Sequence, residues 1–219
     1  MLIESLILDR DDRVVYVSPN ADSSLRRLGI DGELVGERLM DLVPPALGAG
    51  SVPDETLAPE PFARKLVEAV RAAGVAQRTT ILSFDWRALQ AVQKIAPEIG
   101  TVYLSIRQRN FDNIGAGRLE GSTWTAGIQH ADHGSVPKMI KAAGGRIWSS
   151  FHGDLDAAQV KEAKSLGLTV LAWTVNDPAR MAQVMDMGVD GIVTDRPDLL
   201  REEVRRRGLP LPASTPVTP

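Results

Sequence analysis

The chain has 219 residues, of which 43% are hydrophobic and 24% charged, and its 25 basic and 28 acidic residues give a net charge of −3. This composition excludes a disordered or fibrous protein, the lack of a basic run argues against a nucleic-acid partner, and the absence of cysteine excludes disulfides and thiolate chemistry. The length suits one ordinary domain but falls short of the about 250 residues of a typical (β/α)8 barrel.

The N-terminal segment does not have the pattern of a signal peptide. Its apolar stretch is interrupted by Glu4 and is followed by acidic residues from Asp9 onward, whereas a signal peptide begins with positive charge and continues with an unbroken apolar region. No run approaches the about 18 apolar residues of a membrane span. We therefore expect a cytoplasmic protein without a membrane partner.

Two short strands and a linker are predicted before the main part of the chain. The strands are 5–8 and 13–18, separated by a turn of Asp and Arg residues. Residues 44–61 are rich in Pro, Gly and Ala without apolar periodicity, as in linkers and long loops. The pattern predicts a small N-terminal domain at 1–47 and a linker at 48–61.

Residues 62–208 alternate between helical and strand patterns. Apolar, β-branched runs predict buried strands at 79–84, 101–106, 146–150, 168–175 and 191–195. Capping residues mark the helices between them, including Ser135, Asp156 with Gln159, and Asp177 before Pro178. The alternation predicts an α/β fold with a parallel sheet, either a barrel or a doubly wound sheet, followed by a disordered tail at 209–219.

Polar side chains close each predicted strand. In a parallel α/β fold these carboxyl ends meet on one face, where ligands bind. The alternative is that they are ordinary loop and cap residues. The side chains concerned are Ser83, Ser105, Ser149, Ser150, Thr174, Asn176, Thr194 and Asp195. Trp173 either fills the interior or forms an apolar floor for a ligand.

The three histidines give little material for a catalytic cluster. His130 and His133, with Asp132, are metal ligands by residue type, but their polar loop before a helix cap favours a capping role. His152 follows the strand 146–150 on the expected ligand face, which makes it a speculative catalytic residue.

From residue 53 to about residue 211 the chain resembles the glycerophosphodiester phosphodiesterases. The resemblance is carried by PDETLAPEPFARKLVEAV, TTILSFDWRAL, DHGSVPKMIKAAGG and above all LAWTVNDPARMAQVMDMGVDGIVTDRPDLL. It implies a (β/α)8 barrel that hydrolyses glycerophosphodiesters to glycerol 3-phosphate and an alcohol. It also implies a divalent cation, Ca²⁺ or Mg²⁺, and two histidines that act as general acid and base.

The chain departs from the family pattern in its catalytic motifs. It contains no His-Arg and no Glu-x-Asp, and its one Glu-x-Lys, Glu162 to Lys164, lies in a predicted surface helix. The resemblance therefore implies only the C-terminal part of the barrel, about five strand-helix units, without assigned metal ligands. The residues carried over are Ser83, Phe84, Trp173 and Asn176 for substrate binding, and Asp190, Thr194 and Asp195 as structural residues at strand ends.

The first 45 residues resemble the start of a PAS-type sensor domain. LILDRDDRVVYVSPNADSSLRRLGIDGELVGERLMDLVP carries this resemblance through its strand-turn-strand pattern, SPNA and LVGERLMDLVP. The later strands of such a domain are absent, so ligand sensing is not implied.

Three functions remain open. The first is an N-terminally truncated family member with weak or no hydrolysis, whose partner is a small phosphodiester or phosphate. The second is a non-catalytic module that binds phosphate or a polyol, or a sensor, and the third is a chimeric fusion without an evolved function. A sheet with open edges also predicts a homo-oligomer.

Overall fold

The computed structural model describes residues 6–8, 14–17, 58–109 and 111–211. The chain divides into two compact units, Met1–Thr80 and Ile81–Pro219, which are described separately. Most of the predicted PAS-type domain at 1–47, the linker up to residue 57 and the tail from residue 212 lie outside the described residues.

The described residues of the first unit form two strands, an α-helix and a turn of 3-10 helix at Ala76–Arg78. Strands β1 (Leu6–Leu8) and β2 (Val14–Val17) pair antiparallel, which confirms both strands expected here. Helix α3 (Pro59–Ala72) begins within the predicted linker, with proline in its first turn, and is followed by Gly74 at φ +65°. Proline at a helix start and glycine just after its end are the expected punctuation.

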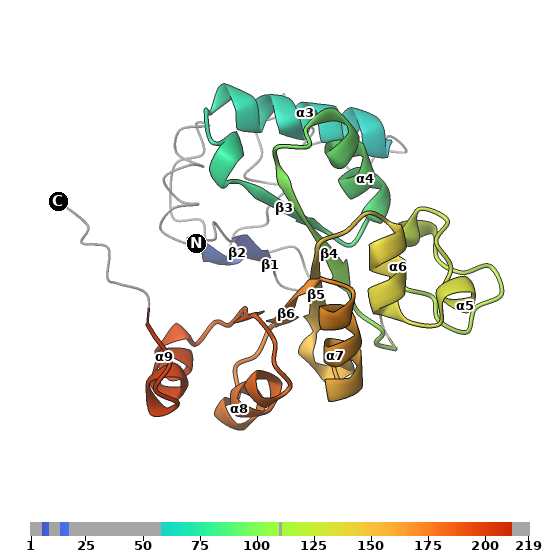
Figure 1. Cartoon of the computed structure of the whole chain (residues 1–219). Coiled ribbons are helices and arrows are strands. Elements are labelled where there is room, and N and C mark those ends of the chain that lie inside the picture. The colour runs from blue at the N-terminus through green and yellow to red at the C-terminus, as the bar shows by residue number, and fades with distance from the viewer. Residues whose placement is uncertain (1–5, 9–13, 18–57, 110, 212–219) are drawn as a thin grey trace. The chain divides into compact units, whose positions relative to one another are not determined.

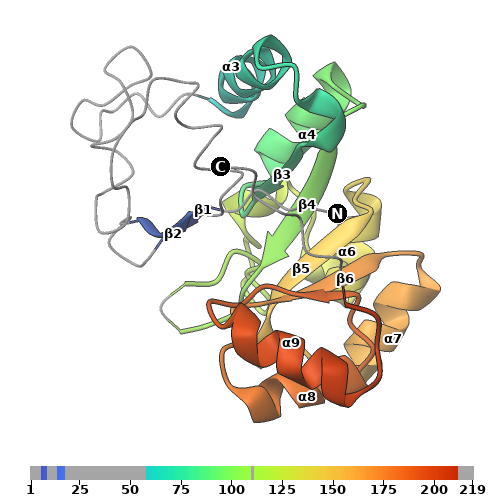
Figure 2. The same cartoon turned by 90° about the vertical axis from the view of Figure 1, so that its left-hand side faces the viewer.

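The second unit is built on a five-stranded sheet whose order, β3-β4-β5-β6-β7, follows the chain. The colour therefore changes steadily across the sheet, from green at β3 to orange at β6 (Figure 1; Figure 2). The pairs β4–β5, β5–β6 and β6–β7 are parallel, which confirms the predicted parallel α/β arrangement. The strands are β3 (Thr80–Ser83), β4 (Gly100–Ser105), β5 (Ile147–Phe151), β6 (Thr169–Trp173) and β7 (Gly191–Ile192).

The hydrophobic core of this unit lies between one face of the sheet and its helices. Tyr103, Trp148 and Val170 stand in register on β4, β5 and β6 and are buried with residues of the helices. The next residues along these strands, Ser149 among them, point to the opposite face because side chains alternate. The helices are α4 (Trp86–Ile95), α5 (His130–His133), α6 (Val136–Ala142), α7 (Ala157–Ser165), α8 (Pro178–Asp186) and α9 (Pro197–Arg206).

The predicted helix caps are present. Ser135 caps α6, Asp177 caps α8, and Asp156 forms a full capping box with Gln159 at α7. The strand predicted at 191–195 is shorter, Gly191–Ile192, although the next residue, Val193, still donates to the Ala172 carbonyl (2.8 Å) and accepts from the Val175 amide (2.9 Å).

The stretch 107–134 is mostly irregular, as predicted, but contains α5 and a turn of 3-10 helix at Thr123–Thr125. Fully buried Asn113 anchors it: Nδ2 donates to the carbonyls of Phe84 (3.2 Å) and Leu104 (3.0 Å), and Oδ1 accepts from the Ile106 amide (2.9 Å). Gly115 has φ +68°, and a Cβ there would lie 2.7 Å from the Gly121 carbonyl oxygen. This loop therefore has a defined course beside the ends of β3 and β4.

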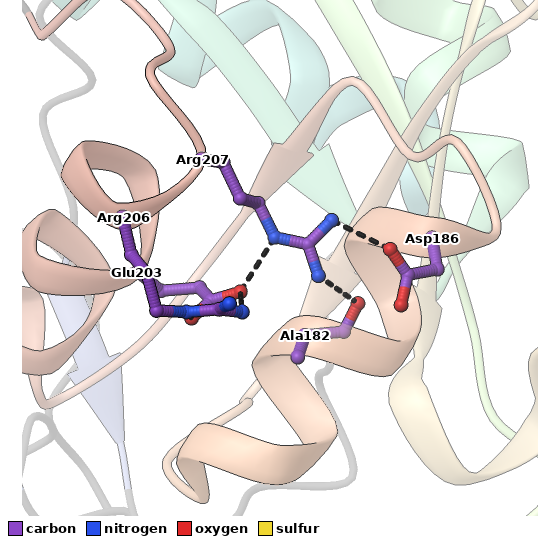
Figure 3. A network of polar contacts seen from close by, with 5 residues as sticks. All are labelled: Ala182, Asp186, Glu203, Arg206 and Arg207. Atoms are coloured by element: carbon purple, nitrogen blue, oxygen red, sulfur yellow. Dashed lines mark hydrogen bonds and ion pairs between the residues drawn. The ribbon is translucent and has the colours of Figure 1, made fainter.

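A polar network joins α9 to α8, side by side in Figures 1 and 2. The guanidinium of Arg207 donates to Asp186 Oδ1 (2.6 Å), the Ala182 carbonyl (3.0 Å) and Glu203 Oε1 (2.5 Å), as Figure 3 shows. Arg206 also pairs with Glu203, and the hydrogen bonds from Arg206 and Arg207 lower the pKa of Glu203 to about 2. None of the helices in the described part of the chain is long and apolar enough to span a membrane.

Candidate functional site

Five aromatic rings meet at the carboxyl end of the sheet. Trp173 ends β6, Phe151 ends β5 in register with it, and Phe84 follows β3. The ring centroids of Trp173 lie 5.6 Å from those of both Phe84 and Phe151. Phe111 lies 5.1 Å from Phe84, and Trp124 lies 5.8 Å from Phe111. We call Phe84, Phe111, Trp124, Phe151 and Trp173 the aromatic cluster.

Two members of the aromatic cluster, Phe84 and Trp173, were predicted from the sequence as substrate-binding residues, and the structure brings their rings into contact. Trp173 is half-buried, and its indole Nε1 donates to the Ser149 carbonyl (3.0 Å), which fixes the ring over β5. Sequence reasoning missed the other three members: Phe111 and Trp124 lie in the irregular loop, where no periodicity assigns a direction to a side chain, and Phe151 lies one residue beyond the predicted strand 146–150.

Asn176 joins the ends of β6 and β7. Its Oδ1 accepts from the Asp195 amide (2.9 Å) and the Thr194 hydroxyl (3.0 Å), and its Nδ2 donates to Asp195 Oδ2 (2.6 Å). The three predicted residues are therefore brought together. An amide nitrogen has two hydrogens, so Nδ2 keeps one beyond this network.

The predicted serines serve the protein itself in different ways. Ser83 Oγ accepts from the Asp85 amide (3.0 Å) in the turn before α4 and is half-buried. Ser105, Ser149 and Ser150 are buried, with exposed fractions of 3% or less, which favours for these three the alternative that they serve the protein's own structure. These serines lie on β4 and β5, which have a neighbouring strand on each side, and Ser149 and Ser150 precede the end of β5 at Phe151.

Asp190 lies at the amino end of β7, away from Asp195. Its Oδ2 accepts from the Val170 amide (2.7 Å), and its other oxygen forms an ion pair with Lys164. Asp190 therefore orients β6 against β7. Glu162, from the Glu-x-Lys match, forms an ion pair with Lys138 at 3.2 Å on the helical layer.

His152 follows β5 and is held by Arg180. The Arg180 Nε donates to His152 Nδ1 (3.3 Å), and its Nη2 donates to the His152 carbonyl. Burial first, and then the Arg180 charge, lowers the pKa of His152, and Asp154 opposes this shift. Since Nδ1 accepts a hydrogen bond, the imidazole is neutral with its proton on Nε2, the form that serves as a weak donor rather than as a charged acid.

The carboxylates near the carboxyl end of the sheet form hydrogen bonds or ion pairs with other groups of the protein. Asp85 caps α4 and pairs with Arg87, Asp154 accepts from the Arg107 amide and from Gln108, and Asp195 is bound by Asn176. His130, Asp132 and His133 lie on the short helix α5. Within the described residues no three or more His, Cys, Asp or Glu side chains gather into a metal site. This described donor set does not fit the divalent cation that the resemblance implies.

Comparison with known proteins gives the family. The model of the glycerophosphoryl diester phosphodiesterase family matches residues 50–199. A glycerophosphodiester phosphodiesterase of Caldanaerobacter subterraneus is 27% identical over 146 residues, which are 66% of this chain and 49% of that protein.

Solved structures agree. A protein of this kind from Silicibacter pomeroyi superposes with a TM-score of 0.57 at 32% identity over 69% of this chain and 46% of its own. A glycerophosphodiester phosphodiesterase from Parabacteroides distasonis gives a TM-score of 0.52 at 26% identity, over 70% of this chain and 56% of its own. The chain thus spans about half the length of these relatives. Because the family model covers more than half of its residues, the chain belongs to the glycerophosphoryl diester phosphodiesterase family.

Proposed function

We propose that the chain binds the glycerophosphate part of a glycerophosphodiester at the carboxyl end of its sheet, and that by itself it hydrolyses such diesters weakly or not at all. The observation that carries the first half is the aromatic cluster beside Asn176 at the strand ends of a family member. Carboxyl ends of parallel strands are where ligands bind in such folds. The aromatic rings supply apolar contact, and the remaining Asn176 hydrogen and the His152 Nε2 proton supply donors.

The second half of the proposal follows from what hydrolysis of a phosphodiester requires. The reaction needs a proton donor for the leaving alcohol, a base for the water, and charge stabilisation on the phosphoryl oxygens. The carboxylates at this end are bound to amides, Arg87 or Asn176. His152 alone offers one neutral imidazole. A catalytic role for His152 stays a prediction.

The architecture that goes with this proposal is the C-terminal part of a (β/α)8 barrel at 62–208. The solved relatives support it, since the five-stranded sheet matches about half of each. The N-terminal region at 1–47 and the linker at 48–61 remain proposals, and the family match begins at residue 50, within the proposed linker. A PAS-type or sensor role, a chimeric origin and a homo-oligomer through the sheet edges likewise remain proposals.

Two measurements on the full chain test the proposed function. Calorimetry measures the binding of glycerol 3-phosphate and of inorganic phosphate. We expect glycerol 3-phosphate to bind, and we expect Trp173→Ala to weaken that affinity about tenfold. Leu119→Ala, which changes a fully exposed side chain outside the aromatic cluster, is the control. Failure of both ligands to bind would contradict the first half.

Hydrolysis is measured as glycerol 3-phosphate released from glycerophosphocholine, with Ca²⁺ or Mg²⁺ added. We expect a rate at least about a hundredfold below that of the Caldanaerobacter relative assayed alongside, since loss of acid–base catalysis costs about 10² to 10⁴ in rate. Metal-dependent turnover comparable to that relative would refute weak hydrolysis.

A further inference from the structure

We propose that Arg180 is a positioning residue for the glycerophosphate ligand: it holds the His152 imidazole uncharged and in one orientation, with the Nε2 hydrogen available to a phosphoryl oxygen. This inference rests on the proposed function, because the phosphoryl group is that of the glycerophosphate bound at the carboxyl end of the sheet. It adds a residue that shapes the site through another side chain, without touching the ligand itself.

Arg180 reaches from the first turn of α8 to the turn that follows β5. Its amide donates to the cap residue Asp177 (2.7 Å), which places it at the start of the helix. In the side chain, Nη1 donates to Gln183 Oε1 (3.1 Å), and Nη2 donates to the carbonyls of His152 and, at 3.4 Å, Leu155. The third nitrogen, Nε, donates to His152 Nδ1 (3.3 Å). All three nitrogens of the half-buried guanidinium therefore bind the protein, and the ring of His152 is held from two sides.

The bond at Nδ1 fixes the protonation state of the imidazole. A guanidinium has only N–H donors and keeps its charge at any ordinary pH. Nδ1 must therefore present its lone pair to Arg180, and the ring carries its single proton on Nε2. Burial and then the Arg180 charge lower the pKa of His152, and Asp154 opposes this shift. Asp154 itself is bound by the Arg107 amide and the Gln108 side chain (both 2.7 Å), so it is not free to pair with the imidazole.

The Nε2 hydrogen lies beside the aromatic cluster. The ring centroid of His152 is 4.7 Å from that of Phe151, which is in turn 5.6 Å from that of Trp173. Among the described residues, none accepts a hydrogen bond from His152 Nε2. A donor that is already oriented by its neighbours loses little conformational entropy when an anion binds. The imidazole also needs no change of protonation to donate, so the lock made by Arg180 favours binding directly.

The first measurement requires no ligand. Long-range ¹H–¹⁵N spectra of the labelled full chain show which nitrogen of each of the three histidines carries a proton, and His152→Gln identifies the signals of His152. We expect one tautomer, protonated on Nε2, in the original chain, and a mixture of tautomers with a raised pKa in Arg180→Met. The signals of His130 and His133, on α5, should stay unchanged. A proton on Nδ1 of His152, or an unchanged spectrum in Arg180→Met, would contradict the inference.

The second measurement is a double-mutant cycle on the calorimetric affinity for glycerol 3-phosphate at neutral pH. We expect His152→Ala to weaken binding about tenfold and Arg180→Met about fivefold, since each removes an oriented hydrogen bond to a charged group. In the His152→Ala background, Arg180→Met should cause no further loss. Arg180→Lys, which keeps the charge and a single donor group, should recover part of the affinity.

The control variant is Arg201→Met, which removes a positive charge from an exposed position on α9 and should bind like the original chain. Thermal melts verify that each variant folds. If Arg180→Met does not fold, Arg180→Lys provides the same two comparisons, because a lysine cannot donate to Nδ1 and to both carbonyls at once.

The outcomes separate this inference from the proposed function. If Arg180→Met weakens binding equally with and without His152, Arg180 acts on the ligand or on the fold, and the inference is wrong. If His152→Ala leaves the affinity unchanged while Trp173→Ala lowers it, the glycerophosphate site stands and the inference fails. If glycerol 3-phosphate does not bind the original chain, the proposed function fails and the inference fails with it.

Discussion

At the scale of single residues, two buried serines in similar positions contribute differently to the free energy of unfolding. Ser105 ends β4 and Ser149 lies in β5, and their exposed fractions are 3% and 0%. Ser105 Oγ accepts from the Trp148 indole at 2.8 Å, whereas Ser149 Oγ has no hydrogen-bond partner among the described residues. A buried polar group without a hydrogen-bond partner lowers the free energy of unfolding. A buried hydroxyl that accepts a hydrogen bond from an indole raises it.

We therefore predict opposite effects for the same substitution. Ser105→Ala should lower the free energy of unfolding by about 1–3 kcal/mol, because the Trp148 indole loses its acceptor. Ser149→Ala should leave the free energy of unfolding unchanged or raise it slightly. The substitution removes a hydroxyl that loses its hydration on folding and gains no hydrogen bond in return. Urea unfolding of the two variants measures both values. A Ser149→Ala variant destabilised as much as Ser105→Ala would mean that the Ser149 hydroxyl has a partner.

The strand-end pattern together with the family resemblance predicted part of the candidate site. Phe84, Trp173, Asn176, Thr194 and Asp195 could be placed near one another because each follows or ends a strand, and parallel strands end together. The bonds that join them could not be predicted, since a one-residue difference in direction decides whether a side chain faces a ligand or a neighbouring strand.

At the scale of secondary structure, the network that holds α9 on α8 depends on carboxylates with lowered pKa values. Hydrogen bonds from Arg206 and Arg207 lower the pKa of Glu203 from 4.5 to about 2, and one from Arg207 lowers that of Asp186. A lowered pKa means that the folded protein binds fewer protons than the unfolded chain in acid. The contribution is thus present above the ordinary pKa of 4.5 and is lost as pH falls toward about 2.

This gives a prediction about Arg207→Ala. The variant should be less stable than the original chain at neutral pH, and the difference should shrink as pH falls from about 5 toward about 2. Urea unfolding midpoints across that range measure the effect, and Arg201→Ala, an exposed position on α9, whose C-cap is Arg207, is the matched control. A difference that stays constant down to the lowest pH would show that the network contributes through packing rather than through charge.

The positions of the helices and strands were largely predictable from the sequence, but some of the residues at which they begin or end were not. Capping boxes and glycine stops depend on adjacent residues, so Asp156 with Gln159 could be recognised directly. After Gly191–Ile192 and Val193, whose backbone still bonds to the β6 segment, Thr194 and Asp195 bind the Asn176 side chain, a contact made across 18 and 19 residues. Local patterns carry no information about such a partner.

At the scale of the whole molecule, the alternation of strands and helices predicted the parallel sheet of the second unit, and the family followed from motifs near its end. Fully apolar strands need covering on both faces, which ties that pattern to an α/β fold. The aromatic cluster could not be predicted in this way, because it joins strand ends to a loop that is anchored by buried side chains, among them Asn113, which binds the Phe84 and Leu104 carbonyls.

The central claim is that glycerophosphate binds at the carboxyl end of the sheet, and amide chemical-shift mapping tests it most directly. Glycerol 3-phosphate titrated into isotope-labelled full chain should shift the amides of residues 83–84, 173–176 and 194–195, with little change at the amino ends of the strands near 99–101 and 167–169. Saturating glycerol 3-phosphate that shifts no amide, or shifts that gather at the amino ends of the strands, would contradict the account.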